Sequence, residues 1–109
     1  MAYVREYEDE SMTREQLDQS AGLRVIEFGA NWCGHCIAAQ PDIEAVFAEH
    51  PELEHEKIAD GPGRPLGRSF RVKLWPTLIL LRDGEEINRV VRPGSADQVR
   101  QLFLSAFPG

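Results

Sequence analysis

The sequence has no apolar run long enough to cross a bilayer. A membrane-spanning helix needs roughly 18–20 apolar residues, and the longest candidate, Thr77–Leu81, is only as long as a strand. Residues 1–10 also lack the basic and apolar regions of a secretory signal. We therefore expect no membrane association and a cytoplasmic location.

Basic residues are scarce relative to acidic ones. The 109-residue chain has 12 Lys and Arg against 18 Asp and Glu, a net charge of −6. Basic side chains supply most of the affinity of nucleic-acid-binding proteins, so this composition argues against nucleic acid as a partner. Apolar residues make up 42% of the chain, which is typical of a globular protein. Without repeats or a long linker, the length predicts a single domain over residues 1–109.

Cysteine is also scarce. The chain has two cysteines, Cys33 and Cys36, and a pair so close together cannot form a disulfide framework. In a reducing compartment, such a pair is more often catalytic or metal-binding than structural.

The apolar pattern predicts alternating strands and helices. A short helix should follow the capping box at residues 13–16, and a second capping box at 95–98 should open the last helix. Asp83-Gly84 is a strong hairpin signal. Strands are expected at residues 3–7, 24–28, 53–59, 77–82 and 85–91, and further helices at 33–50 and 65–70. This order predicts a mixed sheet with helices on both faces.

The two cysteines should lie where a strand leads into a helix. The positive end of the helix dipole and the unpaired N–H groups there favour a thiolate. Because the thiolate is the nucleophile in disulfide exchange, Cys33 should attack first. Cys36, one turn further into the helix, should be more buried and should resolve a mixed disulfide held on Cys33.

Two other interpretations of the pair are open at this point: inert buried thiols and a zinc site. Cys33-x2-Cys36 followed by His50-x4-His55 satisfies a two-cysteine, two-histidine zinc spacing. Against zinc, Pro51 separates the histidines and a helix is expected to start at the cysteines. We expect no metal, and we expect His50 and His55 to lie on the solvated surface.

Several motifs together resemble the thioredoxin family. They are Trp32-Cys33-Gly34-His35-Cys36, Pro41, Trp75-Pro76-Thr77 and Asp83-Gly84, and the resemblance covers nearly the whole chain. It implies an α/β thioredoxin fold, with a mixed central sheet of four or five strands flanked by helices on both faces.

The resemblance also implies a substrate groove. Pro76 would be cis beside the cysteines, turning the backbone of Trp75 outward toward an extended substrate segment. Trp32, Trp75, Pro76 and Thr77 would form this groove. The alternatives are an ordinary trans proline and tryptophans that belong to the core.

Glu27 matches a position where members of the family usually have a buried aspartate. Burial raises the pKa of a carboxyl group, which can then accept a proton near neutral pH. The implied role of Glu27 is to deprotonate Cys36, through water, as Cys36 attacks the mixed disulfide. Lys57 matches the lysine that partners this carboxyl. The alternative for Glu27 and Lys57 is an ion pair on the surface.

His35 stands where thioredoxins usually have proline, and Gly34-His35 is similar to protein disulfide isomerase domains. An imidazole near Cys33 can stabilise its thiolate. Stabilising the reduced form makes the disulfide a stronger oxidant. We therefore predict a redox potential between those of the two kinds of protein.

The resemblance implies a thiol-disulfide oxidoreductase that reduces protein disulfides in cell redox homeostasis and electron transport. Its redox-active group would be the Cys33–Cys36 pair, with no other cofactor. We expect a monomer whose dithiol is restored by a reductase-like electron donor. Two alternatives are a disulfide oxidase or isomerase, and a binding or chaperone-like module in which turnover is incidental.

Overall fold

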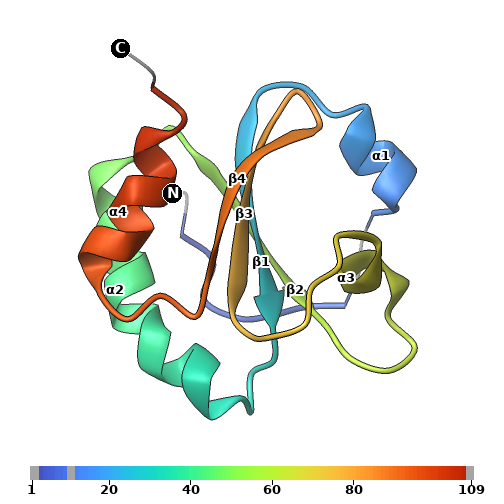
Figure 1. The fold of residues 1–109 in the computed structure, drawn as a ribbon, viewed down its shortest axis with the longest axis horizontal. Coiled ribbons are helices and arrows are strands. Elements are labelled where there is room, and N and C mark those ends of the chain that lie inside the picture. The colour runs from blue at the N-terminus through green and yellow to red at the C-terminus, as the bar shows by residue number, and fades with distance from the viewer. Residues whose placement is uncertain (1–2, 10–11, 108–109) are drawn as a thin grey trace.

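The structure, a computed structural model, describes residues 3–9 and 12–107 (Figure 1). Within them, four strands form one sheet in the order β2-β1-β3-β4. The elements along the chain are α1 (Arg14–Asp18), β1 (Leu23–Gly29), α2 (Gly34–Glu49), β2 (Glu54–Ala59), α3 (Pro65–Ser69), β3 (Thr77–Arg82), β4 (Glu85–Val91) and α4 (Ala96–Leu104). Helices α2 and α4 cover one face of the sheet, and α1 and α3 lie on the other. The predicted mixed sheet with helices on both faces is confirmed.

Strand β1 lies inside the sheet, parallel to β2 and antiparallel to β3. Its residues 25–29 are all buried, because helices cover both faces, and so the strand is a continuous apolar run broken by one glutamate. The register places that residue, Glu27, directly beside Lys57 of β2.

Aromatic side chains fill the core on both faces of the sheet. On the face covered by α2 and α4, Phe47 and Phe103 pack edge to face with ring centroids 4.7 Å apart. On the other face, the rings of Phe28 and Phe70 lie 5.8 Å apart and Leu17 of α1 is fully buried. Burial of these rings is a major source of stability for a chain of this size.

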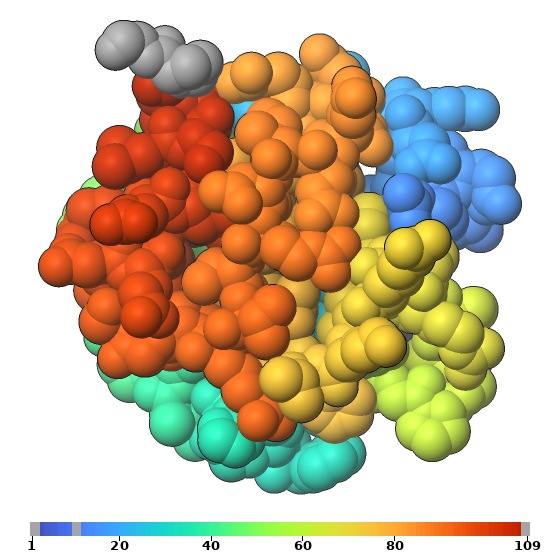
Figure 2. Space-filling model, in the orientation of Figure 1, coloured from blue at the N-terminus to red at the C-terminus, as the bar shows by residue number. Residues whose placement is uncertain are grey.

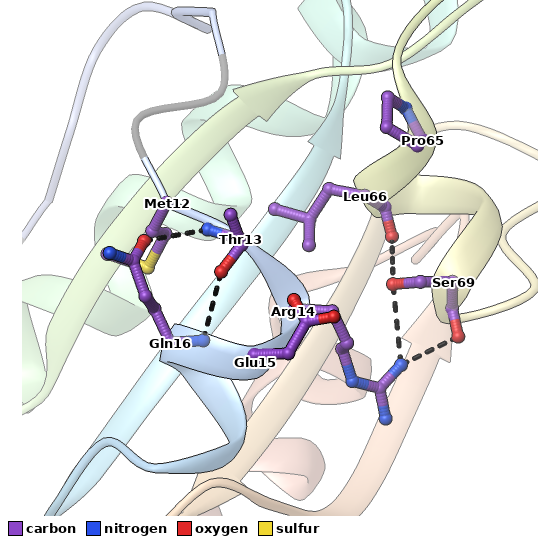
Figure 3. Close-up of a pocket in the computed structure, with 8 residues that line it drawn as sticks. All are labelled: Met12, Thr13, Arg14, Glu15, Gln16, Pro65, Leu66 and Ser69. Atoms are coloured by element: carbon purple, nitrogen blue, oxygen red, sulfur yellow. Dashed lines mark hydrogen bonds between the residues drawn. The ribbon is translucent and has the colours of Figure 1, made fainter.

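Helix α1 has only five residues and depends on its caps and on α3. Thr13 and Gln16 form the predicted capping box, each side chain accepting from the other residue's backbone N–H. Arg14 donates to the Ser69 carbonyl at 2.6 Å and so ties α1 to α3 (Figure 3). The two helices line a hollow of about 590 Å³, to which neither cysteine contributes.

The predicted strand at residues 3–7 is wrong. This part of the chain runs beside β2 and pairs with it only through one bridge, between Glu8 and Ile58. Its N–H groups are bound mainly by side chains: Val4 donates to the His55 ring and Tyr7 to the Asn31 side chain. We call residues 3–9 the N-terminal strap.

The second predicted capping box forms only in half. Ser95 accepts from the backbone N–H of Gln98 at 3.3 Å, but the Gln98 side chain accepts from Gly94 at 2.6 Å rather than from Ser95.

Helix α2, with 16 residues, contains Pro41 as expected. Among the described residues, none of the helices has the length and apolar character needed to span a membrane.

We predict that Gly84→Ala destabilises the protein. Gly84 has φ +82°, and a Cβ there would overlap the carbonyl oxygen of Asp18. The left-handed backbone costs about 1–2 kcal/mol and overpacking about 1–3 kcal/mol. We therefore expect the free energy of unfolding in urea to fall by about 2–5 kcal/mol.

Gly22→Ala is the matched control. Gly22 has φ +83°, but a Cβ there would meet nothing within 4 Å. The free energy of unfolding of Gly22→Ala should fall only by the cost of the left-handed backbone, about 1–2 kcal/mol. Equal losses in the two variants would contradict the role given to the Asp18 contact.

Candidate active site

The two cysteines lie where β1 leads into α2 (Figure 1). Cys33 is the N-cap of α2, and its Sγ accepts from the backbone N–H of Cys36 at 3.3 Å. Both are free thiols in the structure. The N–H donor and the positive end of the helix favour negative charge on the Cys33 sulfur.

Cys36 lies deeper than Cys33, with an exposed fraction of 1% against 7%. It packs with Tyr7 and Ala30 in one small cluster. Burial, with a smaller effect from its hydrogen bond with Cys33, raises the pKa of the Cys36 thiol to about 11. This thiol therefore stays protonated near neutral pH, and it would have to lose its proton before acting as a nucleophile.

The loop before β3 forms the other side of the site. The Trp75–Pro76 peptide bond is cis, and Trp75 packs against the cysteine cluster. Trp32 is 77% exposed, and its ring lies edge-on to that of Trp75 with centroids 5.6 Å apart. Figure 2 shows the beginning of α2 next to the segment that leads into β3, at the lower edge of the molecule. The structure thus brings both tryptophans, the cysteines and Pro76 together.

Two residues of the predicted groove are placed differently from the expectation. The Trp75 carbonyl, expected to be open to a substrate, accepts from Nε of Arg92 at 2.8 Å. The Thr77 side chain is buried and donates to the Leu74 carbonyl at 2.6 Å. Thr77 therefore holds the loop in place, and its hydroxyl does not face the surface.

Glu27 is fully buried and is the centre of a hydrogen-bond network. Its Oε1 lies 2.8 Å from Nε2 of His55. Its Oε2 accepts from Nε2 of Gln40 at 2.8 Å and from the hydroxyl of Tyr7. Three donors to one carboxyl group favour its ionised form.

The hydrogen bonds of His55 fix its protonation state. The backbone N–H of Val4 donates to Nδ1 at 2.8 Å, so Nδ1 carries no proton. Nε2 must then carry the proton that is shared with Glu27, and the imidazole is neutral. Burial, the largest effect, likewise lowers the pKa of His55.

The predicted position of His55 on the solvated surface is therefore wrong, because alternation along β2 turns both His55 and Lys57 inward. His50 is only partly exposed, and its ring stacks on Phe107 with centroids 5.6 Å apart.

The predicted rise in the pKa of Glu27 is also wrong. Burial acts to raise this pKa, but the hydrogen bond from His55 and the positive charge of Lys57 outweigh it. The net effect lowers the pKa of Glu27 below its ordinary value. Glu27 is thus an anion held by donors, rather than a neutral carboxyl group in an apolar pocket.

Lys57 is buried, which excludes the alternative of a surface ion pair. Its Nζ donates to Oε1 of Gln40 at 2.8 Å and to the Arg5 carbonyl at 2.7 Å. Because Gln40 in turn donates to Glu27, the lysine reaches the carboxylate through the amide. Sequence reasoning missed Gln40, although its position four residues after Cys36 places both on one face of α2.

Gly34 and His35, the two residues between the cysteines, are both exposed.

The zinc alternative is not supported by the surroundings of His55. Both ring nitrogens of His55 are already engaged, by Val4 and Glu27. In the part of the chain that the structure describes, no three His, Cys, Asp or Glu residues are grouped to hold a metal ion.

We predict that His55 makes stability depend on pH. The folded pKa of His55 lies below its ordinary value of 6.5, so the unfolded chain binds this proton first as pH falls. Stability should therefore decrease as pH falls below about 6.5. His55→Gln keeps a donor for Glu27 but cannot titrate, so urea unfolding at a series of pH values should show a flatter profile. His50→Gln, a change of the same kind away from Glu27, is the control; a slope as steep in His55→Gln as in His50→Gln would contradict the prediction.

The comparisons with known proteins agree with this geometry. The thioredoxin family profile matches residues 4–104. Thioredoxin from Chlamydia trachomatis is 38% identical over 85 residues, which is 77% of this chain and 82% of its own. Thioredoxin 2 from Pseudomonas aeruginosa, solved in its reduced form, is 55% identical over 94% of each chain, with a TM-score of 0.85. A thioredoxin from Nicotiana alata is 30% identical over 85% of this chain and 80% of its own, with a TM-score of 0.71. The chain therefore belongs to the thioredoxin family and is a protein-disulfide oxidoreductase that acts as a reductant.

Proposed function

We propose that Cys33 attacks substrate disulfides and that Cys36 resolves the resulting mixed disulfide. The observation that carries this assignment is the position of Cys33 as the N-cap of α2, with its sulfur accepting from the N–H of Cys36. The more exposed sulfur is the one that charge stabilisation favours as a thiolate, and the deeper sulfur lies one helical turn behind it.

The reaction proceeds in two exchange steps. The Cys33 thiolate attacks one sulfur of the substrate disulfide, the substrate S–S bond breaks, and the released sulfur takes a proton from solvent. Cys36 then loses its proton and attacks the Cys33 sulfur, which expels the second substrate thiol. Two electrons pass to the substrate, and the Cys33–Cys36 disulfide remains. A thioredoxin-reductase-like donor must return two electrons to restore the dithiol.

Glu27 accepts the Cys36 proton during the second step. Its ionised state, supported by three donors, leaves it able to take a proton. Lys57, acting through Gln40, and His55 are positioning residues that hold the carboxylate in place. General-base assistance lets the sulfur attack without first existing as a free thiolate.

Substrate proteins would bind over the apolar side chains around the thiols. Trp32 is 77% exposed, Ile37 58% and Leu74 47%. An extended substrate segment would lie along the Trp75–Pro76 backbone. Because Arg92 is bound to the Trp75 carbonyl, a substrate that pairs with this carbonyl has to displace that guanidinium. Gly34 leaves the first turn of α2 open, since a Cβ there would meet nothing within 4 Å.

The wider setting is a cytoplasmic monomer of one domain that acts in cell redox homeostasis and electron transport. The match of the family profile over residues 4–104 supports the single domain. The redox group is the cysteine pair itself, without a further cofactor.

We predict that reduction of insulin by dithiothreitol is catalysed by the wild-type protein and not by Cys33→Ser. Cys36→Ser should instead remain linked to insulin as a mixed disulfide, visible on a non-reducing gel. Cys33→Ser should show no such adduct. If Cys33→Ser kept the catalysed rate, the assignment of the nucleophile would fail, and the binding or chaperone-like alternative would gain support.

We predict a redox potential between about −270 mV, typical of thioredoxin, and about −180 mV, typical of protein disulfide isomerase. The pair would be equilibrated in glutathione buffers and followed by tryptophan fluorescence, since Trp32 adjoins it. His35→Pro should lower the potential because it removes an imidazole next to Cys33. A wild-type value at or below that of thioredoxin would contradict the tuning role of His35. A value at the isomerase end would favour the oxidase or isomerase alternative.

A further inference from the structure

The hydroxyl of Tyr7 contacts the Glu27 carboxylate and lies near the Cys36 thiol. Tyr7 is buried in the same small cluster as Cys36 and donates to Oε2 of Glu27. A Cβ at Gly29 would lie 2.7 Å from both the Cys36 Sγ and the Tyr7 oxygen. The absence of a side chain at residue 29 therefore leaves the space in which the two groups lie near each other.

Hydrogen bonds to the backbone hold Tyr7 in place within the N-terminal strap. The backbone N–H of Tyr7 donates to Oδ1 of Asn31 at 2.8 Å, and the Tyr7 carbonyl accepts from Nδ2 of the same side chain at 3.1 Å. The next residue, Glu8, exchanges backbone hydrogen bonds with Lys57 and Ala59 of β2, at 3.1 and 2.8 Å. The backbone of Tyr7 and of Glu8 is thus fixed by hydrogen bonds, and this fixes the position from which the Tyr7 ring enters the cluster.

We propose that Tyr7 is a catalytic residue of the resolving step, whose hydroxyl carries the proton of Cys36 to Glu27. The inference rests on the proposed roles of Cys33, Cys36 and Glu27, and replaces the water expected from the sequence with a side chain of the protein. It makes the strap, which lies outside the cysteine motif, a part of the reaction.

The proton transfer balances within the site. As the Cys36 sulfur begins its bond to Cys33, its proton passes to the Tyr7 oxygen. The Tyr7 proton passes at the same time to Oε2 of Glu27, so tyrosine ends as it began. The Cys33–substrate S–S bond breaks, its electron pair leaves with the substrate sulfur, and that sulfur takes a proton from solvent. Glu27 afterwards returns its proton through the Tyr7 hydroxyl to solvent in the hollow that Tyr7 borders, because the Cys36 sulfur is by then bonded to Cys33.

The charged groups around Tyr7 suit a relay. Glu27 faces its hydroxyl, and Nζ of Lys57 lies 4.3 Å from its ring centroid. Burial and the neighbouring Glu27 charge raise the pKa of Tyr7 above its ordinary value, so the hydroxyl is protonated and can donate. Tyr7, Cys36, Gln40 and Lys57 also border an open hollow of about 430 Å³, through which solvent can reach the relay.

Dithionitrobenzoate separates the two steps, because attack by Cys33 releases the first coloured thiolate and attack by Cys36 releases the second. In stopped flow, Tyr7→Phe should leave the first release unchanged. It should slow the second by about tenfold to a hundredfold, the lower range for losing a general-base path. The difference in the rate of the second release between Tyr7→Phe and the wild-type protein should become smaller as pH rises toward about 11, the pKa of the Cys36 thiol.

Tyr3→Phe is the matched control. Tyr3 lies on the same strap, and its hydroxyl donates to Gln40 at 2.6 Å. The first release should keep the wild-type rate, and the second should slow far less than in Tyr7→Phe, because Tyr3 reaches Glu27 through Gln40 and does not contact it directly. If Tyr3→Phe slows the second release as much as Tyr7→Phe does, the effect comes from loosening the strap and the proposal is overturned.

Glu27→Gln separates a failure of this inference from a failure of the proposed function. If it slows the second release and Tyr7→Phe does not, water carries the proton and only the Tyr7 relay is overturned. If neither variant slows that release, the proposed role of Glu27 falls together with the relay. If Cys33→Ser releases the first thiolate at the wild-type rate, the assignment of the nucleophile fails.

A second measurement keeps the hydroxyl and does not depend on the folding of Tyr7→Phe. The chain has two tyrosines, so Tyr3→Phe grown with fluorotyrosine carries one labelled ring, at Tyr7. Its fluorine resonance should shift with a midpoint near pH 11 as Cys36 ionises, and the shift should vanish in Cys36→Ser. A resonance that does not respond to Cys36 would overturn the contact on which the relay depends.

Discussion

The active site depends on keeping one carboxylate charged inside the protein. An ionised group in the interior is very unfavourable unless it is paired and fully hydrogen-bonded. Glu27 meets this condition through donors from three parts of the chain: His55 of β2, Gln40 of α2 and Tyr7 of the strap. Lys57 adds positive charge through Gln40. The same bonds that make the charge tolerable also join the strap, the sheet and α2 behind the two thiols.

The different chemistry of the two cysteines follows from their depth. Cys33 ends the loop after β1, where its sulfur accepts from the backbone N–H of Cys36 in the first turn of α2. Cys36 lies one turn further in, against the buried network, where burial keeps its proton in place. Identical side chains three residues apart thus have different surroundings, which supports the proposed roles of attacking thiol for Cys33 and resolving thiol for Cys36.

The sequence predicts those features of the structure that local patterns encode. The strands, the helices and the cysteine pair carry short-range signals, namely periodicity, caps and turn residues. The Glu27 network carries none, because its donors come from segments far apart in the chain. Glu54-His55-Glu56-Lys57 has the composition of a solvated strand. His55 and Lys57 face inward on β2 and are bound by the backbone of the strap, 51 and 52 residues earlier in the chain, which no local pattern reveals.

The strap has a consequence for how the protein is made. Its Val4 and Arg5 bind partners 51 and 52 residues later in the chain, on β2. Synthesis proceeds from the N-terminus, so the strap and both cysteines emerge before β2 does. During that interval a nascent chain carries two thiols without the burial and hydrogen bonds that give them separate tasks. The hydrogen bonds from His55 to Glu27 and from Lys57 to Gln40 can therefore form only after β2 has been synthesised.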